Sequence, residues 1–289
     1  MKRKGDMIFW EISELSTTKE KLAELGFADL IPRNDHKTAL IKALKEVLKG
    51  DEKDYERFND KGKSCHFAVL VKHIEGNRHL GYQAEINIRL EKESGVIYHE
   101  DSKPETAAIF AEICDEYQKQ RLTINSNQFR SLVIKAVKEA YGVSVRSGGG
   151  VYYIDERFDE NRVKLERLFQ AFPGQAMLSS FPVYDNESTL QVIENGAYEE
   201  VYAEIETLVR DTEKAFKERK ITKRQLEGKI NEVEEIFKKI SVHKENLRAR
   251  AEALGAKALT FKRAVDLSFS KIEEGVIDPA DFMKLLGEL

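Results

Sequence analysis

Residues 222–265 decide the fold, and they read TKRQLEGKINEVEEIFKKISVHKENLRARAEALGAKALTFKRAV. Apolar side chains recur in this stretch about every three to four positions, a repeat typical of a helix that packs along a partner helix in a left-handed coiled coil. The opening residues Thr222-Lys223-Arg224-Gln225 have the form of a capping box, which predicts that a helix starts there. The repeating positions are Leu226, Ile230, Val233, Phe237, Ile240, the polar exception Lys244, Leu247, Ala251, Leu254, Ala258, Phe261 and Val265.

A shorter apolar repeat precedes this stretch and predicts a helix from about Gly196 to Arg219. The two helices together predict a long antiparallel helical hairpin, or coiled coil, in the C-terminal part of the chain. At about 1.5 Å per residue the first arm is about 36 Å long, whereas an unbroken second arm approaches 70 Å. Gly255 is a candidate bend, and Asp278-Pro279 predicts one last short helix.

The surplus length of the second arm needs a partner, which is the N-terminal body, the last helix or another subunit. We expect residues 247–269 to form a subunit contact, because an exposed heptad face seeks a partner. The sequence therefore predicts a homo-oligomer. The predicted interface residues are Leu247, Leu254, Phe261 and Val265.

The N-terminal part alternates between helix and strand signals, which makes the chain an α+β protein with an N-terminal antiparallel sheet and helices. We expect a charged surface loop at 51–62 and a polar, turn-rich boundary at 185–196. The predicted domains are therefore 1–190, which is α+β, and 191–289, which is helical. The predicted strands are 7–12, 65–74, 82–90, 97–98, 143–145, 151–154 and 177–184, and the predicted helices are about 18–26, 35–49, 104–119, 126–141 and 159–171.

Composition limits the classes of function. The 289 residues are 41% hydrophobic, enough for a core, and 34% charged, above the roughly 25% of an average globular chain. A net charge of -4 lacks the broad positive field of a general nucleic-acid coat. Glu11 interrupts the only apolar run near the start, and nowhere does a run approach the roughly 20 residues that span a bilayer. We expect no membrane partner and a cytoplasmic location in a bacterial or archaeal host.

Signals for catalysis or metal binding are missing from the sequence. Cys65 and Cys114 lie far apart in apolar settings, and the six histidines show none of the usual ligand spacings. Acidic residues gather at 155–160, but in a charged turn before a helix rather than as a pair in a cleft. We therefore expect a protein that is not an enzyme and that carries no cofactor or metal.

The most distinctive motif is residues 146–154, RSGGGVYYI. Glycines in such a run suggest a phosphate-binding loop, but a phosphate loop leads into a helix, whereas Gly148, Gly149 and Gly150 lead into the strand pattern of Tyr152 and Tyr153. The motif, with Arg146, instead predicts a tight β-hairpin.

Residues 128–154, from Gln128-Phe129-Arg130 to the end of that motif, resemble a pattern in uncharacterised phage- and plasmid-borne proteins. Those proteins share a helix, then an Arg-x-x-Gly-Gly-Val-Tyr-aromatic-aliphatic hairpin, and often a helical C-terminal part. This sequence departs from the pattern by one extra glycine. The resemblance implies a mobile-element setting, where small binding proteins act on replication, transcription or host defence, and it implies no enzyme activity.

The order of two helices and a hairpin in 104–155 also matches a winged helix-turn-helix. Between residues 119 and 146 only Glu139 opposes the cations, and amide side chains near 125–128 are placed to reach base edges. The alternative is a solvated polar face on an ordinary core motif. The candidate nucleic-acid contacts are Arg121, Asn127, Gln128, Arg130, Lys135, Lys138 and Arg146.

Two functions therefore remain. The first is a non-enzymatic binding or regulatory protein of a phage or mobile element that acts on a host or element protein complex, including counter-defence. The second is a DNA-binding protein that uses the helix and hairpin of 124–155.

Overall fold

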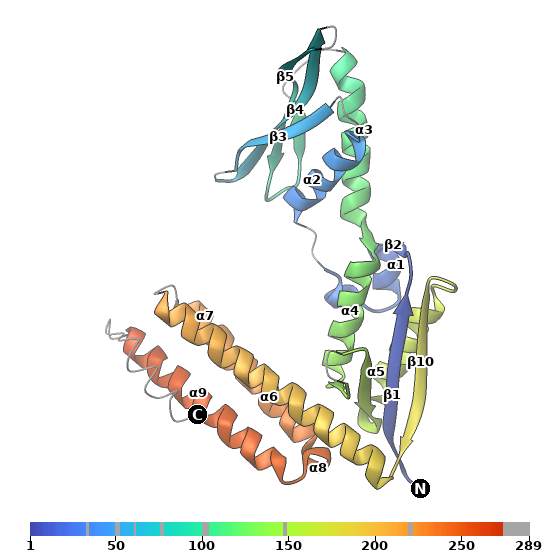
Figure 1. Ribbon diagram of the computed structural model, residues 1–289, viewed down its shortest axis with the longest axis vertical. Helices are drawn as coiled ribbons and strands as arrows, with labels where there is room; N and C mark the ends of the chain where they lie inside the picture. Colours follow the sequence, from blue (N-terminus) through green and yellow to red (C-terminus); the bar gives the residue numbers. More distant parts are fainter. Residues whose placement is uncertain are drawn as a thin grey trace. The chain divides into compact units, whose positions relative to one another are not determined.

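The computed structural model describes residues 1–32, 35–49, 53–60, 62–75, 78–99, 104–146, 149–218 and 222–273 (Figure 1). It contains antiparallel sheets and many helices, so the α+β class is confirmed. The chain divides into two compact units. Unit 1 comprises residues 1–12 and 133 onward, and unit 2 comprises residues 13–132.

Unit 1 contains a four-stranded antiparallel sheet in the order β10-β1-β9-β8. Its strands are β1 (Arg3–Ile12), β8 (Val143–Ser144), β9 (Val151–Asp155) and β10 (Ala176–Tyr184). After β9, a 3-10 helix η2 (Glu156–Phe158) leads into α5 (Asp159–Gln170), which packs against β9 and β10. The buried face of α5 carries Leu165, Leu168 and Phe169.

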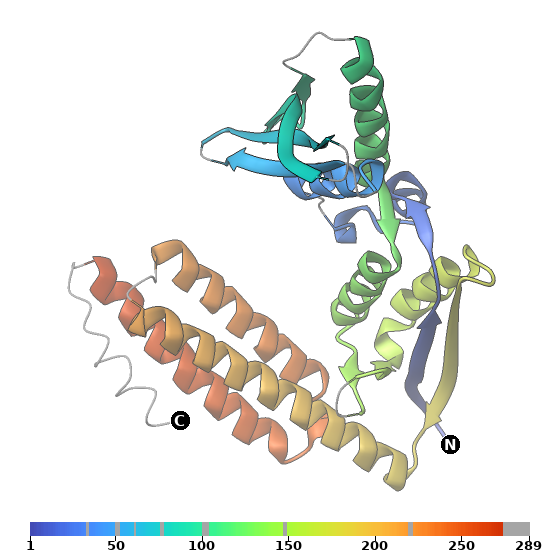
Figure 2. The same ribbon diagram turned by 45° about the horizontal axis from the view of Figure 1, so that its top comes forward.

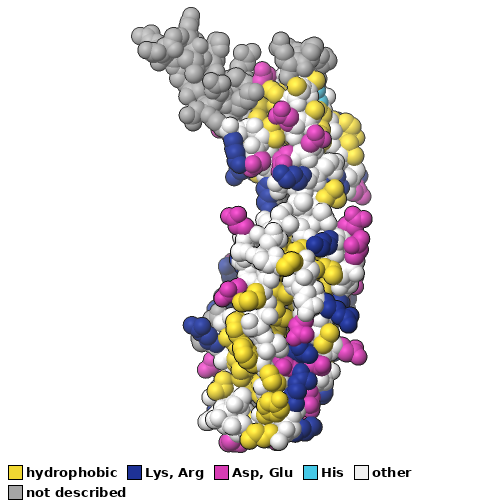
Figure 3. All heavy atoms as spheres, turned by 90° about the vertical axis from the view of Figure 1, so that its right-hand side faces the viewer, with side chains coloured by type: hydrophobic (Ala, Val, Ile, Leu, Met, Phe, Trp, Pro, Cys, Tyr) yellow, Lys and Arg dark blue, Asp and Glu magenta, His cyan; other side chains and the backbone are white. Residues whose placement is uncertain are grey.

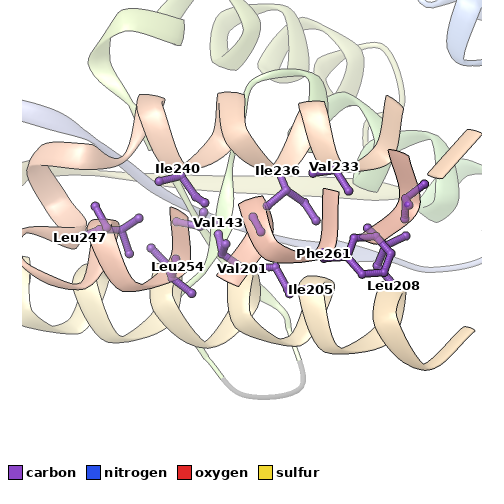
Figure 4. Close-up of a cluster of buried hydrophobic side chains, with 14 of the residues drawn as sticks. Val143, Val201, Ile205, Leu208, Val233, Ile236, Ile240, Leu247, Leu254 and Phe261 are labelled. Atoms are coloured by element: carbon purple, nitrogen blue, oxygen red, sulfur yellow. The ribbon is translucent and has the colours of Figure 1, made fainter. Parts of the chain in front are cut away.

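The rest of unit 1 is helical. α6 (Glu187–Lys217), α7 (Lys223–Val242) and α9 (Arg250–Glu273) lie side by side, with the short α8 (Lys244–Leu247) between α7 and α9 (Figures 1 and 2). Thr222 and Gln225 form the predicted capping box at the start of α7. Figure 4 shows side chains from all three long helices meeting in one core, which Val143 of β8 joins.

The second arm, predicted as one long helix, is divided into α7, α8 and α9. The prediction of a two-helix hairpin with arms of unequal length is therefore corrected to three long helices. The helix ends at Val242, Arg248 takes a left-handed φ of 52°, and α9 then runs back along α7. The turn thus lies near 243–249 and not at Gly255, which is inside α9. The surplus length expected to contact another subunit is folded back onto the same chain.

That fold-back buries the predicted interface residues. Leu247, Leu254, Phe261 and Val265 are each at most 1% exposed within a single chain. They belong to the core shared with α6 and α7. The prediction of a subunit contact through these four side chains is therefore wrong, because no exposed stripe remains along them.

Two other segments differ from expectation. Residues 185–196 were predicted to be a polar boundary, but α6 starts at Glu187, where the Asn186 side chain accepts a hydrogen bond from the Ser188 amide (3.0 Å). The contacts accordingly divide the chain after Ile12 and after Leu132 rather than near residue 190. The predicted loop at 51–62 contains the strand β3 (Lys53–Asn59).

Unit 2 is built on an antiparallel sheet with the strand order β3-β4-β5-β6. After β3, its strands are β4 (Ser64–Glu75), β5 (Arg78–Glu91) and β6 (Ile97–His99). The helices α2 (His36–Val47) and α3 (Pro104–Leu122) pack together and share its core with residues such as Phe67 and Tyr117. The smaller elements are β2 (Ser16–Thr18), α1 (Lys19–Glu24), the 3-10 helix η1 (Ala28–Leu30) and β7 (Thr123–Asn125), which pairs with β2.

Across the described ranges, no helix combines the length and the hydropathy needed to cross a membrane. The short helix predicted after Asp278 lies outside the described residues.

Candidate binding groove of unit 1

The groove starts from α4 (Ser126–Glu139), which is amphipathic. The helix begins with a reciprocal cap. The backbone N–H of Gln128 donates to the side-chain oxygen of Asn125 (3.0 Å), and the backbone N–H of Asn125 donates to the side-chain oxygen of Gln128 (3.2 Å). Apolar residues at helical spacing, including Val133 and Val137, are buried. The opposite face therefore presents Ile134, Lys135 and Lys138 to solvent.

The chain leaves α4 through a tight turn. Tyr141 adopts a left-handed φ of 49°, and the Gly142 amide donates to the Val137 carbonyl (2.9 Å). A Cβ atom at Gly142 would lie 2.5 Å from Val137 Cγ1, so only glycine fits this close approach. β8 follows at once and pairs with β9, which confirms the predicted hairpin for the described residues.

The hairpin tip uses glycines for their backbone freedom. Gly149 and Gly150 have φ values of 81° and 95°, and the Gly149 amide donates to the Arg146 carbonyl (2.9 Å). Both glycines lead directly into β9, so the helix that a phosphate loop requires does not follow them. Gly148 lies outside the described residues.

α6 forms the other wall by packing against β8. A Cβ atom at Gly196 would lie 2.5 Å from the Ser144 carbonyl oxygen, which shows how closely the helix approaches the strand. One helical turn later, Glu200 accepts a hydrogen bond from the Ser144 amide. The buried ammonium group of Lys239 holds Glu200 (2.6 Å) and Glu204 (3.0 Å).

These elements enclose an open groove of about 510 Å³. Lys138 and Arg146 are its cations, and Glu199 is an exposed acid on the α6 side. Within the described part of the chain, Lys135, Lys138 and Arg146 make no ion pair, whereas Glu200 is neutralised by Lys239. The lining residues are Ile134, Lys138, Ser144, Arg146, Gly149, Tyr152, Gly196, Glu199, Glu200 and Ala203.

Tyr152 contributes an aromatic surface to the groove. Its ring stacks on Trp10 of β1, with centroids 5.0 Å apart and planes 11° apart, so its orientation is fixed by the sheet. Burial raises the pKa of the Tyr152 hydroxyl, and the nearby Glu200 carboxylate acts in the same direction. Tyr152 therefore stays neutral near pH 7 and keeps its hydroxyl proton as a donor.

The structure brings four of the predicted residues together, namely Lys138, Arg146, Gly149 and Tyr152. Lys135 is exposed on the same helix, and Gly150 follows at the tip. Tyr153 has a different place, because alternate residues of a strand face opposite sides. It is fully buried, donates to the Lys4 carbonyl (2.6 Å) and lies against His243.

The remaining predicted contacts belong to unit 2 and make local interactions there. The Arg121 guanidinium lies over the Tyr117 ring at 5.4 Å. Asn127 accepts a hydrogen bond from Arg130 (2.8 Å), and Gln128 caps α4. The segment 104–155, proposed as a winged helix-turn-helix, is thus divided between the two units, and α3 packs against α2.

Three of the four carboxylates of 155–160, namely Asp155, Glu156 and Asp159, are engaged in ion pairs. Asp155 pairs with Arg157 (2.7 Å), and Asp159 pairs with both Arg162 and Arg3 at 2.7 Å. Hydrogen bonds from Arg162 and Arg3 lower the pKa of Asp159 to about 2. The pair of Asp159 with Arg3 ties the start of α5 to β1.

Sequence reasoning missed the α6 wall of the groove, namely Gly196, Glu199, Glu200 and Ala203. A signal was present, because a glycine followed by a helical apolar repeat often marks a close approach between backbones. The polar stretch before Gly196 instead suggested that this glycine ends a loop. Among the described residues, no group of three or more His, Cys, Asp or Glu side chains is placed to hold a metal ion.

Comparison with known proteins gives a family but no activity. A family model described as a family of unknown function (DUF6744) matches residues 5–273. No curated protein matches the chain, and no solved structure matches it.

Proposed function

Because the chain belongs to this family of unknown function, DUF6744, we propose its function from the groove: it is a non-enzymatic protein that binds the phosphate backbone of nucleic acid there. The observation that carries this proposal is the meeting of Lys138 and Arg146, from α4 and from the hairpin, with no acidic partner in the described chain. Two cations on different elements that face one opening favour an anionic ligand.

The side chains around this pair suit a polyanion. Arginine binds a phosphate through a fork of N–H groups, and lysine adds a flexible point charge. Lys135 extends the positive surface along α4 beyond the groove. Tyr152 offers a fixed, neutral hydroxyl and an aromatic ring to a sugar or base.

Glu199 opposes this binding and so provides a sharp test. It is exposed at the rim and makes no ion pair within the described part of the chain, so its charge repels a phosphate that approaches Lys138. Removing that charge should strengthen binding, whereas removing the cations should weaken it. Opposite effects from neighbouring positions are hard to obtain from a general loss of structure.

We test the proposal by fluorescence anisotropy with labelled single-stranded and duplex oligonucleotides over a range of salt concentrations. The variant Lys135→Ala/Lys138→Ala/Arg146→Ala should bind at least about tenfold more weakly, and its salt slope should fall by about one unit for each phosphate that the protein no longer binds. Glu199→Gln should bind more tightly than the unmodified protein.

The matched control is Arg210→Ala/Lys214→Ala/Arg263→Ala, which changes the net charge equally at exposed positions of α6 and α9. It should retain most of the affinity. An equal loss in the control and in the groove variant would show that only net charge matters and would refute a specific site.

A protein partner is the second candidate, and one observation favours it. Ile134, which is 36% exposed, and Ala203 line the same groove as the charges, a mixture found at protein interfaces. In the phage or plasmid setting that the hairpin resemblance implies, such a protein acts on a host or element complex, for example in counter-defence. Affinity purification with and without nuclease separates the two candidates, because a direct protein partner survives the nuclease and is lost with Ile134→Asp.

A further inference from the structure

β10 is the outer strand of the unit 1 sheet. It pairs with β1 along all of its length, from Ala176 opposite Ile12 to Tyr184 opposite Arg3. On its other side the described chain supplies no strand. An edge of nine residues with no strand beside it is a template for pairing with another chain.

Three observations show which backbone groups point outward. Pro182 has no N–H, so its pair with Asp6 is one without hydrogen bonds, and its carbonyl points away from β1. The Ala176 amide donates to the Phe172 carbonyl (3.1 Å) rather than to β1. The backbone N–H of Asp185 donates to the carbonyl oxygen of Lys2 (3.0 Å), on the β1 side. Since the pattern alternates, the N–H and C=O groups of Leu178 and Ser180 face the open edge.

Apart from Pro182, the side chains of β10 do not protect this edge. Met177 is 52% exposed and Phe181 is 56% exposed, and both lie on the sheet face that also holds Ser179. From Ala176 to Tyr184 the strand carries no charged residue, although charge is a common protection of natural edge strands. Figure 3 looks onto the side of the molecule on which β10 lies, and hydrophobic side chains gather there.

We propose that β10 pairs antiparallel with β10 of a second copy of this chain, about a two-fold axis at Ser179. In this register Leu178 of one copy lies opposite Ser180 of the other, and their outward N–H and C=O groups bond in both directions. The outward N–H and C=O groups of Leu178 and Ser180 in each strand are thereby satisfied by those of Ser180 and Leu178 in the other copy, as a two-fold interface requires.

The same register pairs the exposed side chains. Met177 of one copy lies directly opposite Phe181 of the other on one face of the joined sheet, a contact between a thioether and an aromatic ring. Phe181 is already held against Phe9, with ring centroids 5.8 Å apart. This fit of the strand to itself is the reason for a second copy rather than an unrelated peptide, and the absence of charge means that no like charges oppose each other.

The first test is the mass of the full chain in solution by sedimentation velocity. We expect twice the chain mass of 33.1 kDa at tens of micromolar protein. Ser180→Pro, which removes an outward N–H as Pro182 already does, and Phe181→Lys should each shift the protein to the mass of one chain. Leu267→Lys, at an apolar α9 residue that is 50% exposed, should leave the mass doubled. An unmodified protein of single mass at about 100 micromolar overturns the proposal.

The second test fixes the register. Ser179 faces its own copy across the axis in a pair without hydrogen bonds, where Cα atoms are about 4.5 Å apart and a disulfide fits. Ser179→Cys should therefore form a disulfide-linked dimer on mild oxidation, while the unmodified chain and Ser131→Cys, at an exposed site in α4, should form no covalent dimer. A protein of doubled mass in which Ser179→Cys does not cross-link would place the interface elsewhere and overturn the proposal.

Discussion

At Gly196 a single hydrogen atom in place of a side chain lets α6 touch β8. A methyl group there would lie 2.5 Å from the Ser144 carbonyl oxygen and 2.7 Å from Val145 Cα, both backbone atoms that cannot move aside freely. We predict that Gly196→Ala lowers the free energy of unfolding by about 1–2 kcal/mol, because overpacking exceeds the gain in helix propensity. Urea unfolding followed by circular dichroism measures this change.

Gly228 in α7 is the matched control, since a Cβ atom there would meet no atom within 4 Å. Gly228→Ala should raise the free energy of unfolding by about 0.5–1 kcal/mol through helix propensity alone. If both variants were stabilised, the close approach of α6 to β8 would not exist in solution.

The buried side chain of His243 makes the free energy of unfolding depend on pH. The ring is fully buried, its Nε2 lies 2.6 Å from the Tyr141 carbonyl, and its Nδ1 lies 3.4 Å from the Asn246 amide nitrogen. Burial lowers its pKa below the ordinary value of 6.5, against the opposing effect of the Tyr141 carbonyl. The nearby Lys239 and Arg157 also lower this pKa, and Asp155 raises it.

The unfolded chain then binds a proton at His243 more readily than the folded chain does. The stability that the neutral ring contributes is fully present above about pH 6.5 and decreases as the pH falls through the lowered pKa. We predict that the free energy of unfolding falls between pH 7.5 and pH 5. His243→Gln, which keeps a donor for Tyr141 but does not titrate, should flatten this part of the profile, and an unchanged slope would contradict the assignment.

Individual residues were predictable where the cause is local. Lys138, Arg146 and Tyr152 were identified from their charge and motif, and the groove contains all three. Glu200 was not, because its bond to the Ser144 amide joins positions 56 apart in the sequence. No pattern near either residue records that contact, which follows from the packing of α6 on the sheet.

Among the elements, α9 gains most of its stability from the face that turns toward α6 and α7. Phe261 is fully buried in that core, whereas Leu259 on the same helix is 40% exposed. We predict that Phe261→Ala lowers the free energy of unfolding by about 3–5 kcal/mol and that Leu259→Ala changes it by less than about 1 kcal/mol. Chemical unfolding of both variants checks this, and equal costs would place α9 differently.

Helix starts were easier to predict than helix ends in this chain. The capping box of Thr222 and Gln225 is a local signal, and α7 begins where it predicts. The break after Val242 was missed because the apolar repeat continues in step from Ile240 to Leu247 and Ala251, so both a straight and a folded helix bury the same positions. β3 was missed because most of its residues are charged, although Tyr55 packs against the core of unit 2.

At the scale of the whole molecule, two separate cores predict two unfolding transitions. Phe67 is fully buried in the core of unit 2, and Phe261 is fully buried in the core of unit 1. We expect Phe67→Ala to lower the temperature of one calorimetric transition and Phe261→Ala to lower the other. A single transition that both variants shift equally would show that the two units unfold together.

The division into these units could not be predicted from composition, because unit 2 is inserted between β1 and the rest of unit 1. The link across the insertion is the pairing of β1 with β9 and β10, in which Tyr153 reaches Lys4 over 149 positions. The polar stretch near residue 190 suggested a boundary, but it forms the first turns of a helix.

The place of β1 between β9 and β10 has a consequence for biosynthesis. A ribosome makes β1 before unit 2, whereas both of its neighbours emerge only after the whole of unit 2. At about 5–20 residues per second the delay is on the order of ten seconds. Unit 2 can finish folding in that interval, while an apolar segment that contains Ile8, Phe9 and Trp10 lacks its sheet partners and is exposed to aggregation.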